Sequence, residues 1–184
     1  MDDLKVLANY IKERNQNEVR ITELIDRPAA IGHIGEYIAS RIFNIELEES
    51  ASHKGSDGCF QDGDLKGCSV NIKWYAMRQG LLDINPDGLP DYYLVLTGPE
   101  SKTMTSRGAV RPWIVDAVFL FKADELMPQL KETGVKIGIA SSVKKQLWDS
   151  AQIYPHQTSN LLLLTEEQRR LLALFSEKTK DIFD

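Results

Sequence analysis

The sequence predicts an α/β domain, or a closely related α+β one, with a mixed central β-sheet flanked by helices. Helical periodicity opens the chain, a cluster of short apolar runs follows, and helices then alternate with a late strand. The length of 184 residues fits a single domain. We therefore expect one domain over 1–184, with an N-terminal helical extension (1–27), a core (28–98) and a remainder of strand and helices (99–184).

Two helices are predicted at the N-terminus. The first covers residues 2–16, where apolar residues recur at helical spacing: Leu4, Leu7, Ala8 and Ile11. Thr22 is expected to cap a short turn, and Pro28 suits the first turn of the second helix. That helix has an apolar stripe and is expected to end at Asn44.

The strands are predicted from β-branched and aromatic runs between turns. They cover 45–50 (IELEES), 57–61, 68–76 (CSVNIKWYA), 91–98 (DYYLVLTG) and 112–121 (PWIVDAVFLF). The polar turn QDGDLKG between the second and third runs predicts a β-hairpin.

Three helices are predicted in the C-terminal half. They lie near 122–133, within 141–152 with Ser141 or Ser142 as the cap, and over 165–183. Thr165 followed by Gln168 is a capping box, in which each side chain satisfies a free backbone amide of the other.

Composition excludes several classes of protein. No run reaches the roughly 18–20 apolar residues of a membrane span, and the N-terminus lacks the features of a signal peptide, so we expect a cytoplasmic protein without membrane contact. The net charge of −5 argues against binding nucleic acid by charge alone. Cys59 and Cys68 are expected to be reduced thiols rather than a bridge or a zinc site.

The run SVNIKWY places polar side chains inside an apolar strand. Alternation puts Asn71 and Lys73 on one face, with apolar residues on the other. Asp57 lies on the preceding strand of the predicted hairpin, within reach of this pair. Glu36 lies in an apolar helix, where an acid is costly unless it is paired or binds a metal.

These elements resemble the core of the PD-(D/E)xK nuclease superfamily, the fold of many restriction endonucleases. The resemblance covers roughly residues 28–76 and rests on GHIGEYIASRIF, KGSDG and VNIKWY. It implies a restriction-endonuclease-like core whose catalytic residues are Glu36, Asp57, Asn71 and Lys73. It further implies that Glu36, Asp57 and Asn71 hold Mg²⁺ (or Mn²⁺), while Lys73 orients or deprotonates water or stabilises charge on the phosphate.

The activity implied is hydrolysis of DNA phosphodiester bonds, in restriction or defence, by a homodimer acting on double-stranded DNA. The sequence departs from the family at Asn71, where many members have an acid. An amide oxygen can bind Mg²⁺ but brings no charge, which leaves open a nuclease-fold domain that only binds DNA or a protein partner.

Each of these residues also has a structural explanation. Asp57 suits a turn in any protein, Lys73 can extend from a half-exposed strand, and Glu36 can lie at the edge of the stripe. Six basic residues are candidates for phosphate contacts and are equally explained by solvated loops: Lys54, Lys102, Arg107, Arg111, Lys144 and Lys145.

Overall fold

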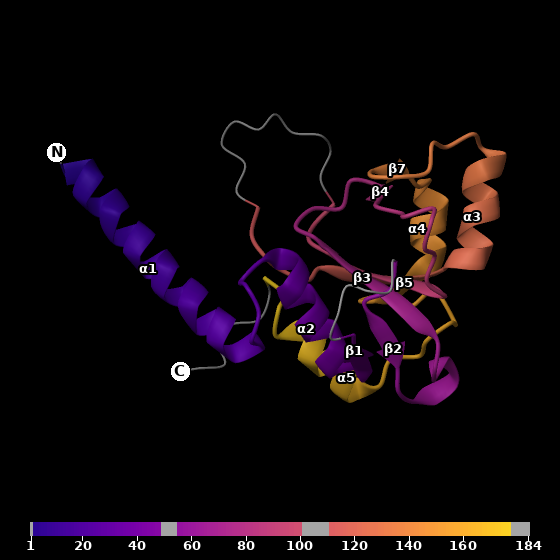
Figure 1. The fold of residues 1–184 in the computed structure, drawn as a ribbon, viewed down its shortest axis with the longest axis horizontal. Coiled ribbons are helices and arrows are strands. Elements are labelled where there is room, and N and C mark those ends of the chain that lie inside the picture. Colours follow the sequence, from indigo (N-terminus) through magenta and orange to yellow (C-terminus); the bar gives the residue numbers. More distant parts are fainter. Residues whose placement is uncertain (1, 49–54, 101–110, 178–184) are drawn as a thin grey trace.

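The computed structural model describes residues 2–48, 55–100 and 111–177 (Figure 1). Its helices are α1 (Asp2–Ile25), α2 (Ile31–Phe43), α3 (Ala123–Glu132), α4 (Lys145–Ala151) and α5 (Glu166–Ala173), with a 3₁₀ turn, η1 (Gly63–Leu65). Its strands are β1 (Ile45–Leu47), β2 (Gly58–Phe60), β3 (Ser69–Tyr75), β4 (Leu81–Leu82), β5 (Tyr92–Thr97), β6 (Ala117–Lys122), β7 (Ser141–Ser142) and β8 (Gln152–Tyr154).

A mixed sheet forms the centre of the domain. In the described residues it has six strands in the order β1-β2-β3-β5-β6-β8. β1, β2 and β3 form an antiparallel meander, β5 runs parallel to β3, and β6 and β8 continue antiparallel. β4 and β7 form a separate antiparallel pair. The predicted α/β class and the predicted hairpin of β2 with β3 are both confirmed.

Both faces of the sheet are buried. One face packs against α2 and α5, and its core includes Val70, Ile72 and Trp74. The other face packs against α3 and α4, and its core includes Tyr93 and Val95 of β5. The ribbon in Figure 1 shows the two pairs of helices on opposite sides of the sheet. β5 is therefore buried along its whole length, as expected of a central strand covered on both faces.

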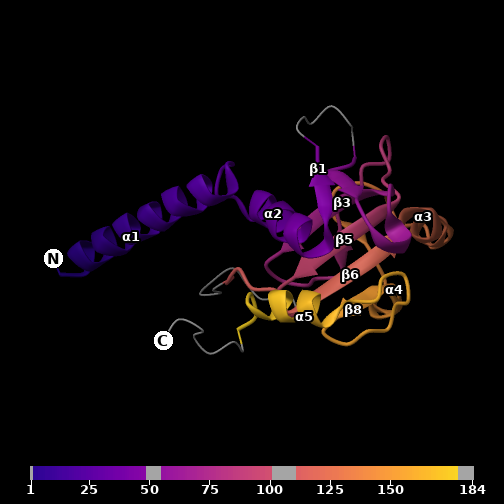
Figure 2. The same cartoon turned by 90° about the horizontal axis from the view of Figure 1, so that it is seen from below.

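Helix α1 projects away from the rest of the domain. Figures 1 and 2 show that its N-terminal end has no other helix or strand of the described residues beside it. Most of its large apolar side chains are exposed, among them Leu4, Leu7 and Ile11. No helix in the described part of the chain is both long and apolar enough to cross a membrane.

Several predicted boundaries were wrong. The strand predicted over 112–121 begins only at Ala117, and the helix predicted over 165–183 ends at Ala173. α1 continues to Ile25, so Thr22 lies inside the helix and does not cap a turn. α2 begins at Ile31, three residues after Pro28. Ser141 and Ser142 form β7 and pair with β4, and the hydroxyl of Ser141 donates to the Gly138 carbonyl, so α4 begins only at Lys145.

Other predicted details are confirmed. Asn44 ends α2 in the left-handed conformation, at φ 49°, which asparagine tolerates better than most residues. The capping box of α5 is formed, because Thr165 accepts from the Gln168 amide while the Gln168 side chain accepts from the Thr165 amide.

Candidate active site at the edge of β3

The candidate site lies where β2 stops accompanying β3. In the described residues β2 pairs with β3 only at Gly58–Val70 and Cys59–Ser69, so the edge of β3 beyond Val70 has no neighbouring strand. From this point on, Asp57 forms the hydrogen bonds to this edge of β3. Its amide donates to the Val70 carbonyl at 2.8 Å, and its Oδ2 accepts from the Ile72 amide at 2.6 Å. A side-chain carboxylate thus replaces a strand as the acceptor for Ile72.

Glu36 reaches the same region from α2. Gly35 allows this helix to lie directly on β3, because a Cβ at position 35 would come within 2.9 Å of the Trp74 Cβ. The Glu36 side chain is 16% exposed and forms an ion pair with Arg27, which lies between α1 and α2. Glu36 is therefore held with its charge compensated by a guanidinium.

The charges around Asp57 connect these residues electrostatically. Burial raises the pKa of Asp57 above its ordinary value, the Ile72 amide lowers it, and the negative charge of Glu36 raises it. Lys73 and Arg27 lower it again by their positive charges. Glu36 and Lys73 thus each act on Asp57, and a cation near Asp57 would relieve the unfavourable part of this balance.

Lys73 and Asn71 occupy the face of β3 that was predicted, but that face is not open. Lys73 is half-buried, whereas Asn71 is only 7% exposed and pairs in register with the buried Tyr93. The Asn71 Oδ1 has no hydrogen-bond partner in the described part of the chain, and neither does the Tyr93 hydroxyl. Such a buried carbonyl oxygen calls for a partner, which a cation or a water molecule would supply.

Of the three predicted oxygen ligands, Asp57 and Glu36 act on the same edge, whereas Asn71 lies on the face of β3 opposite α2 and is not brought to the two carboxylates. Of these, Asp57 Oδ2 is already engaged by an amide and Glu36 by Arg27. Within the described residues, no group of three or more His, Cys, Asp and Glu side chains is placed to hold a metal ion. A hard cation at this edge would therefore rely on the carboxylates of Asp57 and Glu36.

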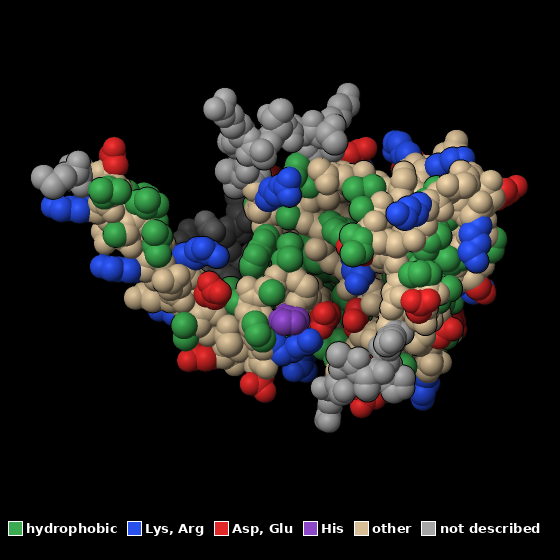
Figure 3. Space-filling model, turned by 45° about the horizontal axis from the view of Figure 1, so that its top comes forward, with side chains coloured by type: hydrophobic (Ala, Val, Ile, Leu, Met, Phe, Trp, Pro, Cys, Tyr) green, Lys and Arg blue, Asp and Glu red, His purple; other side chains and the backbone are tan. Residues whose placement is uncertain are grey.

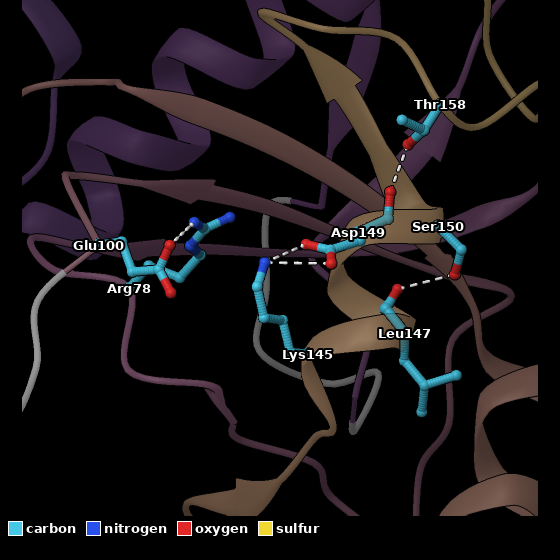
Figure 4. Close-up of polar contacts among 7 residues, drawn as sticks. All are labelled: Arg78, Glu100, Lys145, Leu147, Asp149, Ser150 and Thr158. Atoms are coloured by element: carbon cyan, nitrogen blue, oxygen red, sulfur yellow. Dashed lines mark hydrogen bonds and ion pairs between the residues drawn. The ribbon is translucent and has the colours of Figure 1, made fainter.

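The predicted basic residues are not gathered at this site. Lys54, Lys102 and Arg107 lie outside the described residues, while Arg111 and Lys144 are exposed. Lys145 is on α4 and forms an ion pair with Asp149 at 2.8 Å (Figure 4). Because α4 packs on β6, which is separated from β2 by β3 and β5, Lys145 and Asp57 lie at different parts of the sheet.

Two arginines were missed in the sequence. Arg27 pairs with Glu36, and its signal was an arginine directly before the proline that precedes α2. Arg78 follows β3, forms an ion pair with Glu100 and stacks over Phe119 at 5.4 Å. Figure 4 shows the Arg78 and Lys145 ion pairs lying near one another, around a pocket of about 180 Å³ that Trp148 also lines.

No protein-family model matches this chain, and no curated protein matches it in sequence. The fold class is therefore defined by the structure itself, as an α/β domain with a mixed sheet and helices on both faces.

Figure 3 shows acidic and basic side chains close together near the junction of α1 with the body of the domain.

Proposed function

We propose that this chain is a Mg²⁺-dependent endonuclease that hydrolyses DNA phosphodiester bonds, with a restriction-endonuclease-like core and a role in restriction or defence. The observation that carries the proposal is the Asp57 carboxylate at the edge of β3, where it accepts from the Ile72 amide next to Lys73 in the chain. These residues follow the order of the PD-(D/E)xK pattern, from a helix glutamate to an aspartate before a strand and a lysine on the next strand.

The proposed roles follow from the position of each side chain. Asp57 and Glu36 would hold the cation; Asn71, the third ligand that the resemblance implies, has an Oδ1 without a partner in the described residues but lies on the face of β3 away from α2. A bound Mg²⁺ would polarise the phosphate and lower the pKa of a bound water. Lys73, half-buried beside Asp57, would orient the attacking water, help to deprotonate it, or stabilise charge developing on the phosphate.

The proposal requires the Arg27–Glu36 ion pair to break when the cation binds, because the Glu36 carboxylate cannot bind both the guanidinium and the cation closely. The pair is partly exposed, with Arg27 at 42%, so breaking it costs only about 1 kcal/mol. Arg27 would then be free to contact a phosphate.

A plasmid-nicking assay with Mg²⁺ or Mn²⁺ tests the enzyme. Asp57→Asn and Lys73→Ala are expected to lose at least about 100-fold in rate, as is usual when a metal ligand or a charge-stabilising group is removed. Asp64→Asn, an exposed acid in η1, is the matched control and should keep full activity. Cleavage that persists unchanged in both site variants would refute the site.

The second candidate is a domain of the same fold that binds DNA or a protein partner without cleaving. The neutral Asn71 and the Arg27–Glu36 ion pair favour it, because both reduce the negative charge offered to a metal. Fluorescence anisotropy with labelled duplex DNA separates the candidates when wild type binds without nicking.

A further inference from the structure

Helix α1 carries a regular apolar stripe that nothing in the described structure covers along its N-terminal half. The spacing alternates between three and four residues along the whole helix, at Leu4, Leu7, Ile11, Arg14, Glu18, Ile21 and Ile25. This alternation is the a/d pattern of a coiled coil. Leu4, Leu7 and Ile11 are 71%, 53% and 49% exposed, and Figure 3 shows hydrophobic side chains along α1.

The stripe contains two charged residues at its centre, Arg14 and Glu18. Both side chains are largely exposed, and a guanidinium nitrogen of Arg14 lies 4.0 Å from a carboxylate oxygen of Glu18 in the same helix. Charges at such positions weaken a coiled coil but select its partner and register. The stripe is symmetric about residue 16: positions 7 and 25, 11 and 21, and 14 and 18 lie at equal distances along the chain on either side of it.

An antiparallel pair of α1 helices related by a two-fold axis at residue 16 uses this symmetry. Leu7 of one chain then meets Ile25 of the other, and Ile11 meets Ile21. At the centre, Arg14 of each chain meets Glu18 of the other, which forms two ion pairs. A parallel pair would instead place Arg14 against Arg14 and Glu18 against Glu18.

The C-terminal half of the stripe leads into an apolar groove of about 400 Å³. The groove lies between α1, α2, α5 and the segment before β6, and its lining includes Ile21, Ile25, Ile34, Ile38, Trp113 and Leu174. In the antiparallel arrangement, the N-terminal end of the partner's α1 lies level with this groove. The stripe spans about 32 Å, so the helix is long enough to reach from the axis into the groove.

We infer that α1 is a dimerisation arm, which pairs antiparallel with α1 of a second copy and seats Leu4 and Leu7 in that copy's groove. The charges of α1 are mixed in sign, which fits self-pairing and not the basic face of a helix that lies on a membrane. The inference is independent of the nuclease proposal, since it uses none of the residues of the β3 edge.

Light scattering coupled to size exclusion tests the inference on the full chain. Wild type is expected at twice the chain mass of 20.8 kDa. Arg14→Glu and Glu18→Arg each turn both central ion pairs into like-charge contacts, and each variant is expected at 20.8 kDa, with dimer affinity at least tenfold weaker. Mixing the two variants restores opposite charges and should restore a particle of twice the mass.

Lys12→Glu is the matched control, because Lys12 is exposed and lies outside the stripe. It makes the same charge reversal and should leave the dimer intact. Acrylamide quenching gives a second readout, since Trp113 is half-exposed in the groove while Trp74 and Trp148 are buried. Quenching should increase in each single variant and fall again in the mixture.

A wild-type chain at 20.8 kDa would overturn the inference and leave the stripe to another partner. A parallel pair would also be distinguished, because a single reversal there exchanges one like-charge contact for another and would leave the mass unchanged. Circular dichroism shows whether the single variants keep α1 helical. Should one lose helicity, failure of the mixture to recover twice the mass would count against the inference.

Discussion

Gly35 allows α2 to approach β3 closely, and its replacement by alanine tests how tightly Glu36 is held beside Asp57. A Cβ at position 35 would lie 2.9 Å from the Trp74 Cβ, an atom too near the backbone to move away cheaply. Overpacking of this kind costs about 1–3 kcal/mol. Alanine also gains about 1 kcal/mol over glycine in helix propensity, so Gly35→Ala should range from neutral to about 2 kcal/mol less stable.

Gly32 is the matched control in the same helix. It is exposed and has nothing within 4 Å of an added Cβ, so Gly32→Ala should gain the propensity of about 1 kcal/mol without any cost. The propensity cancels between the two variants, which should therefore differ by about 1–3 kcal/mol. Thermal unfolding measures this at about 2–4 °C for each kcal/mol in a domain of this size. Equal stabilisation by both substitutions would refute close packing of α2 on β3.

Three further predictions concern the site and the last helix. Asp57→Asn should become more stable relative to wild type as pH rises from about 3 to 7. The pKa of Asp57 is raised in the folded state, so the folded wild type binds this proton more tightly than the unfolded chain. The free energy of unfolding of wild type therefore falls as pH rises above the ordinary value of 3.8. Guanidinium unfolding at several pH values measures this difference, and a constant offset would contradict it. Arg27→Gln should lower the Mg²⁺ concentration for half-maximal nicking about fivefold, because it removes an ion pair worth about 1 kcal/mol, and an unchanged metal titration would exclude competition for Glu36. Thr165→Ala should cost about 1 kcal/mol by removing the acceptor for the Gln168 amide, while Thr165→Ser keeps it; equal melting temperatures would show that the cap contributes nothing.

The elements that could be predicted from the sequence are those with a strong local signal. β3 and β5 are long β-branched and aromatic runs, and the capping box of α5 identifies its first turn. The short strands β4, β7 and β8 could not be predicted, because their pairing partners are distant in the chain. The cap expected at Ser141 failed because tertiary pairing with β4 took precedence over a local preference.

The site was predictable in part, for the same reason. Strand alternation and hairpin pairing placed Asp57 beside β3, and the resemblance added Glu36. Alternation cannot predict how deeply a side chain is buried. It placed Asn71 on the polar face of β3, but the core formed with α3 and α4 covers that face, so Asn71 is buried. The Arg27–Glu36 pair was also out of reach, because it depends on how the chain turns between α1 and α2.

The bond from the Ile72 amide to Asp57 Oδ2 makes one backbone proton a reporter of the state of a carboxylate. Amides in the interior of a ladder sense only their neighbouring strands, whereas this one senses an ionisable side chain. Its nuclear magnetic resonance should shift as Asp57 gains or loses a proton and shift again when a cation takes the carboxylate. A titration followed at this single peak would thus read the chemistry of the site directly, without DNA or any turnover.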